Sequence, residues 1–157
     1  MKTTSFLVLI ALAGFLFCGA AGAQEKATVR VRVVVASNER SEPPIPTELA
    51  DVANVLRKQR YASYRLVGDK RYRMGVGEEV TQQLTDVDRL ELALTSIGKA
   101  DIKLTVALLR WDKDKEGYKT TKKMLVTLRA GESYALFDDR VRVNDMDTFL
   151  FVTYVPD

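Results

Sequence analysis

The sequence has no histidine and a single cysteine, Cys18. Histidine is the commonest general base and metal ligand near neutral pH, so its absence excludes most hydrolase triads and histidine metal sites. One cysteine cannot form an intramolecular disulfide, so the fold must be held together by packing. The sequence also has no glycine-rich phosphate loop, and we expect no cofactor and no bound metal. These absences favour a protein that is not an enzyme.

Residues 1–23 have the pattern of a signal peptide. Lys2 precedes an apolar stretch at 6–17 that is shorter than the about 20 residues needed to span a bilayer, and small residues end at Ala23. We therefore expect cleavage near Ala23 and a periplasmic or secreted location. The alternative is lipoprotein processing at Cys18, which the bulky Phe17 before it disfavours.

Residues 24–157 are expected to form one domain that is nearly neutral. The whole chain has 24 Lys and Arg against 21 Asp and Glu, and loss of Lys2 lowers its net charge of +3 by one. This charge gives no reason to expect nucleic-acid binding. No later stretch is apolar enough to span a membrane, and the scarcity of cysteine favours a bacterial envelope over an oxidising secretory lumen.

Hydrophobic periodicity predicts a mainly β domain (α+β) with one helix near its start. Valines alternate along residues 29–35 with Arg30 and Arg32, as in a strand with one buried and one solvated face. Thr47 is then expected to cap a helix that runs to Lys58. The helix would pack on a sheet through an apolar stripe made of Leu49, Val52, Ala53 and Leu56.

Everything after the helix reads as strands separated by turns. Strands are expected at 61–67, 72–76, 90–94, 102–108, 124–128, 133–137 and 149–155, and Gly68-Asp69 is expected to join the first two. Seven to eight short strands, with one helix between the first and the second, predict an antiparallel β-sandwich or open barrel. Because residues 149–155 are apolar on both faces, we expect that strand to be central with the helix covering its back; an assembly interface is the alternative.

This order of elements, together with two short sequences, resembles small exported bacterial β-rich proteins of unknown function. The sequences are Tyr-Ala-Ser-Tyr-Arg-Leu-Val at 61–67 and Gly-Glu-Ser at 131–133. The resemblance implies an exported β-rich domain and brings no activity or ligand with it.

Two acidic patterns resemble functional sites, namely a calcium-binding loop and pairs of catalytic carboxylates. Residues 112–117 match the first six positions of a calcium loop, but Lys123 stands where a bidentate carboxylate is required, so a solvated hairpin tip is expected. Asp138 and Asp139 are adjacent, so in an extended strand they point to opposite faces and cannot serve one site. The pairs 86/88 and 145/147 lie at the edges of expected strands, where aspartate ordinarily supports turns. We expect no catalytic residue among them.

Positive charge is concentrated between Arg57 and Arg73, where seven basic residues and three tyrosines accompany one acidic residue, Asp69. Arginine and tyrosine are enriched at protein interfaces, and arginine also suits anionic polymers. The candidate binding residues are Arg60, Tyr61, Tyr64, Arg65, Arg71, Tyr72 and Arg73. The alternative is a solvated sheet edge whose arginines pair with the acidic residues Asp138, Asp139, Asp145 and Asp147.

The sequence therefore predicts an exported, non-enzymatic binding or assembly module of the bacterial cell envelope. Its expected partner is another envelope protein or an anionic envelope polymer. The competing hypothesis is a carboxylate-based hydrolase or a protein that binds calcium or a small ligand.

Overall fold

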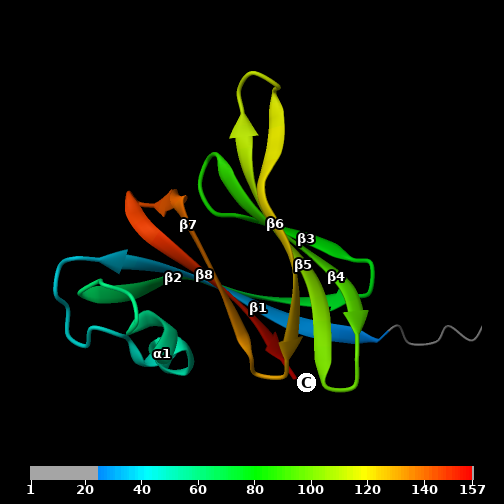
Figure 1. The fold of residues 1–157 in the computed structure, drawn as a ribbon, viewed down its shortest axis with the longest axis horizontal. Helices are drawn as coiled ribbons and strands as arrows, with labels where there is room; N and C mark the ends of the chain where they lie inside the picture. Colours follow the sequence, from blue (N-terminus) through cyan, green and yellow to red (C-terminus); the bar gives the residue numbers. More distant parts are fainter. Residues whose placement is uncertain (1–24, 157) are drawn as a thin grey trace, which may run out of the picture.

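The computed structural model describes residues 25–156, which form two antiparallel four-stranded sheets (Figure 1). Sheet A has the strand order β2-β1-β8-β7 and consists of β1 (Lys26–Ser37), β2 (Ser63–Gly75), β7 (Ser133–Val143) and β8 (Met146–Val155). Sheet B has the order β3-β4-β5-β6 and consists of β3 (Glu79–Gln83), β4 (Asp88–Ile97), β5 (Asp101–Asp112) and β6 (Gly117–Arg129). The predicted antiparallel sandwich is confirmed, and it is not a closed barrel. The signal-peptide and Cys18 predictions concern residues outside the described range.

The main core lies between the inner faces of the two sheets. Val29, Val31 and Val33 of β1 are buried there with Leu104 and Val106 of β5. Each is one of a set of apolar residues two positions apart, so the period of the strand places all of them on the same face. Burial of a Val or Leu side chain stabilises a fold by about 1.5–3 kcal/mol, and this repeated pattern is what pairs the sheets.

Strand β8 is buried on both faces, as its composition predicts. Leu150 and Val152 belong to the main core, whereas Phe149 and Phe151 face the opposite side of sheet A. That outer side is covered by the helical segment that follows β1 (Figure 1). The predicted central position of this strand, with the helix at its back, is confirmed.

The helical segment consists of a 3-10 helix, η1 (Thr47–Val52), followed by a single α-turn, α1 (Ala53–Leu56). Its apolar stripe is buried in a second core, as predicted. The expected cap at Thr47 is wrong, because Thr47 is already the first helical residue and Pro46, in an extended conformation, precedes it. No side-chain cap is formed there. Within residues 25–156, no helix is long and apolar enough to cross a membrane.

The expected turn at Gly68-Asp69 is also wrong, since β2 runs through it without a break. A β-bulge absorbs the local irregularity: Gly68 pairs with Val33 and Leu66 with Val34, so Val67 has no directly opposed partner. A Cβ on residue 68 would lie 3.2 Å from the Val33 Cγ2 atom. Glycine at this position therefore reflects close packing between two strands.

Arg32 is not on a solvated face, contrary to the prediction from strand alternation. Its side chain is 0% exposed because the helical segment covers this part of sheet A. Asp51 of η1 supplies the opposing charge. Arg30, two residues earlier, retains partial exposure.

Candidate functional site

Two of the seven predicted binding residues, Arg71 and Arg73, lie together on an exposed face of β2. Arg71 is directly opposite Arg30 across the β1–β2 pair, and Arg73 is opposite Thr28. Directly opposed residues of antiparallel strands point to the same side, which here is the outer side of sheet A that also carries Arg32. We call Arg30, Arg71 and Arg73 the basic face.

One carboxylate, that of Asp69, lies among these arginines. The Arg30 guanidinium donates two hydrogen bonds to it, from Nε to Oδ1 at 2.8 Å and from Nη2 to Oδ2 at 2.6 Å. These bonds hold the pKa of Asp69 below its usual range and raise the pKa of Arg30. Because this one carboxylate faces both Arg30 and Arg71, that part of the basic face keeps an excess of positive charge.

Tyr64 belongs to the second core and Tyr61 packs against it, so neither lies on the basic face. The buried Tyr64 donates its hydroxyl hydrogen to the Leu56 carbonyl at 2.8 Å, and burial raises its pKa. Tyr61 donates to Asp147 Oδ2 at 2.7 Å, which raises its pKa to about 12. Both rings contact Phe149 edge to face. These contacts make both tyrosines part of the packing between the helical segment and sheet A.

The remaining predicted residues are separated further. Tyr72 packs against the main core and donates to Gln82 Oε1 at 3.1 Å. Arg60 is exposed between α1 and β2, and Arg65 borders a hollow at the end of sheet A. The structure therefore brings Arg71 and Arg73 together but does not place all seven residues on one surface.

The acidic residues near the C-terminus are bound mainly by arginines of their own hairpin. Asp138 accepts hydrogen bonds from Arg140, and Asp147 lies 3.6 Å from the Arg142 Nε atom. Of the basic segment, it is Tyr61 that reaches Asp147. The expected pairing of Asp138 or Asp147 with the basic segment's arginines is not formed among the described contacts.

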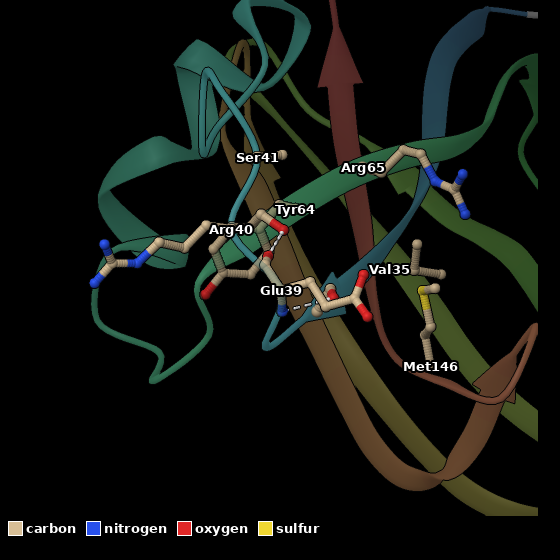
Figure 2. Close-up of a pocket in the computed structure, with 9 residues that line it drawn as sticks. Val35, Glu39, Arg40, Ser41, Tyr64, Arg65 and Met146 are labelled. Atoms are coloured by element: carbon tan, nitrogen blue, oxygen red, sulfur yellow. Dashed lines mark hydrogen bonds between the residues drawn. The ribbon is translucent and has the colours of Figure 1, made fainter.

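A hollow of about 210 Å³ opens where β1 and β2 meet the loop after β1. Val35 and Met146 provide apolar lining, and the Glu39 carboxylate points to the side where they lie (Figure 2). Arg40 and Arg65 extend away from the hollow in opposite directions (Figure 2). It is thus a small open depression whose two arginines are not directed into it.

The serine hydroxyls of this hollow are occupied in shaping the loop. Ser63 Oγ donates to the Glu39 carbonyl at 2.6 Å, and Ser37 Oγ accepts from the Glu39 amide at 3.0 Å. Ser41 Oγ donates to the Pro43 carbonyl. None of the three contacts a side chain that could act as its general base among the described residues, so the geometry gives no nucleophilic centre.

Two aspartates of the candidate pairs, Asp88 and Asp138, are held in structural contacts with arginines. Asp88 is buried and accepts hydrogen bonds from Arg110 at 2.7 and 3.1 Å. Asp138 is held by Arg140, which lowers its pKa to about 2. Asp145 lies in the β7–β8 turn with a positive φ of 60°. With its pKa lowered in this way, the Asp138 carboxyl is ionised near neutral pH and is poorly suited to act as a general acid.

The calcium-like stretch 112–117 is at the tip of the β5–β6 hairpin, which projects from the body of the molecule (Figure 1). Asp112 Oδ1 accepts the amide hydrogen of Asp114 at 3.1 Å, as in an ordinary turn. The part of the chain that the structure describes contains no group of three or more potential metal-ligating His, Cys, Asp or Glu residues.

Comparison of the chain with family models, curated proteins and solved structures found no match. The function is therefore inferred from the chain's own surfaces. Sequence reasoning missed Arg30 as a member of the basic face. The signal that could have found it is the alternation of Arg30 with Val29 and Val31, but its neighbours across the sheet depend on the β1–β2 register.

Proposed function

We propose that this chain is an exported, non-enzymatic module of the bacterial cell envelope that binds an anionic partner through the basic face. The leader-like pattern of residues 1–23 supports export. The absence of histidine from the sequence and the structural use of Ser63, Asp88 and Asp138 favour binding over catalysis. The partner is an envelope protein with an acidic surface or an anionic envelope polymer.

The observation that carries the proposal is the direct opposition of Arg30 and Arg71 across two strands. Like charges in directly opposed positions destabilise a sheet, and here Asp69 offsets only part of their repulsion. Arg71 forms no hydrogen bond or salt bridge with the described residues, so its guanidinium is available to a partner. A bound carboxylate or phosphate group would relieve the repulsion and gain charge-assisted hydrogen bonds.

The proposal is tested by immobilising the purified protein and capturing material from a detergent extract of the bacterial envelope. The wild type should retain a defined partner that Arg71→Glu/Arg73→Glu does not retain. A matched reversal at the hairpin tip, Lys113→Glu/Lys115→Glu, changes net charge equally and should retain it. Equal capture by both double variants would show that the basic face does not bind.

A further inference from the structure

The outer face of sheet B is open, whereas that of sheet A is covered in part by the helical segment. Strand register places three rows of residues on this face. The rows are Gln83–Arg89–Leu109–Thr120, Thr81–Glu91–Ala107–Lys123 and Glu79–Ala93–Thr105–Leu125. The helical segment packs in the second core, on the outer side of sheet A. Every residue of the three rows except Ala107 is at least partly exposed.

The centre of this face has unusually small side chains. Ala93, Thr105 and Ala107 form the floor of a hollow of about 150 Å³, bordered by Glu79, Glu91 and Lys123. Leu125, at the neighbouring position on β6, is 64% exposed. A floor of alanine and threonine lets another protein surface approach closely, and Leu125 offers an apolar group to that surface.

The two sides of the hollow carry opposite charge. Glu91 on β4 and Lys123 on β6 flank Ala107 of β5 in a single row. Their backbones therefore lie two strand spacings apart, about 9–10 Å. Neither side chain makes a hydrogen bond or ion pair with the described residues, which leaves two unpaired charges of opposite sign on either side of β5.

We propose that a second copy of this chain packs on the outer face of sheet B, related by a two-fold axis parallel to β5. Such an axis brings β4 of one copy over β6 of the other. Glu91 then meets Lys123 of the second copy twice, once on each side of the axis. A two-fold axis perpendicular to the strands would instead place β4 over β4 and Glu91 over Glu91, which like-charge repulsion disfavours.

The same operation pairs apolar groups of complementary size. In the adjacent row, Leu125 of each copy comes over Ala93 of the other, so a large side chain fills the space above a small one. Lys103, the next outward-facing residue of β5, would lie over Lys103 of the other copy. This like-charge contact marks the end of the interface. The axis on β5 superposes β4, β5 and β6 of the two copies and leaves β3 outside the contact. Three strands of about ten residues present on the order of 450 Å² per copy, which is below the about 800 Å² per partner of a standard interface and fits a weak, concentration-dependent dimer.

The test is sedimentation velocity over a concentration series, on protein purified after expression of the full chain. Wild type should show a monomer–dimer equilibrium, and Lys123→Glu and Glu91→Lys should each weaken it at least tenfold, because each replaces both Glu–Lys contacts by like-charge contacts. An equimolar mixture of the two variants should restore dimers, since every contact is again between opposite charges. The matched control Lys113→Glu, at the hairpin tip, should behave as wild type.

Leu125→Arg keeps the proposal testable if a charge variant folds poorly, because Leu125 is mostly exposed and its replacement should leave the circular dichroism spectrum unchanged. It too should weaken dimerisation. A wild type that stays monomeric at the highest concentration reached would overturn the proposal. So would a dimer that persists in Lys123→Glu and Leu125→Arg, or a variant mixture that stays monomeric while both proteins are folded.

Discussion

Arg32 and Asp51 form a two-point ion pair between β1 and the helical segment. Arg32 Nη1 donates to Asp51 Oδ1 at 2.7 Å, and Nη2 donates to Oδ2 at 2.6 Å. The guanidinium is fully buried, whereas the Asp51 side chain is half exposed. The pair therefore fastens the helical segment to sheet A through a charge that has no access to solvent.

Removing Asp51 should leave the Arg32 charge buried without its carboxylate. Breaking a buried pair in this way costs about 3–5 kcal/mol, and the partial exposure of Asp51 places Asp51→Ala near the lower end of that range. Chemical denaturation should show this loss, and Arg32→Met/Asp51→Ala should recover most of it because the buried charge is gone. If Asp51→Ala were as stable as wild type, the pair would have no structural role.

Asp138 should make the protein less stable in acid. The hydrogen bonds from Arg140 lower its pKa to about 2, so in the folded state it stays ionised below the about 3.9 of an unfolded chain. A lowered carboxyl pKa contributes stability above the unfolded value and loses it as the pH falls to the folded value. Asp138→Asn should therefore reduce the loss of unfolding free energy between about pH 5 and about pH 2.

The matched control for this measurement is Asp139→Asn, which alters the exposed neighbouring carboxylate. It should leave the acid dependence close to that of wild type. Identical curves for Asp138→Asn and wild type would mean that the contact with Arg140 does not stabilise the fold.

Tyr61 should ionise only at strongly alkaline pH because its hydroxyl donates to a carboxylate of β8. Its hydrogen bond to Asp147 raises its pKa to about 12, so the contact is fully present below the unfolded value of about 10 and is lost as the pH rises through about 12. Tyr61→Phe should remove a phenolate transition near pH 12 from an absorbance titration and lower stability by about 1 kcal/mol. Tyr154→Phe is the control and should leave this phenolate transition in place. Loss of the transition in Tyr154→Phe, and not in Tyr61→Phe, would show that the transition does not belong to Tyr61.

Simple periodicity was sufficient to predict the sandwich and its cores. Val29, Val31 and Val33 alternate with polar residues, and so they occupy the face expected of them. Arg30 and Arg32 look equivalent in that pattern, yet only Arg32 is buried. The difference arises because the helical segment covers Arg32 but not Arg30. Strand alternation predicts the face on which a residue lies, but not which part of that face another element covers.

The basic face could be predicted only in part because of the bulge at Val67. In an unbroken strand, Tyr64 and Arg71 would point to opposite sides, since they are an odd number of residues apart. The extra residue reverses this relation, and both lie on the outer side of sheet A. Tyr72, adjacent to Arg71, necessarily points inward, so the charged and aromatic residues of this segment are divided between two faces.

Binding of an anionic envelope partner by the basic face can be tested by cosedimentation of the purified protein with isolated envelopes at increasing salt. Wild type should bind at low salt and be released as salt rises, because exposed charges are screened beyond about 8 Å at physiological ionic strength. Arg71→Glu/Arg73→Glu should bind at least tenfold more weakly at low salt while it remains folded by circular dichroism, and Lys113→Glu/Lys115→Glu should match wild type. If the Arg71→Glu/Arg73→Glu variant bound as strongly as wild type at every salt concentration, the basic face would not be the binding surface.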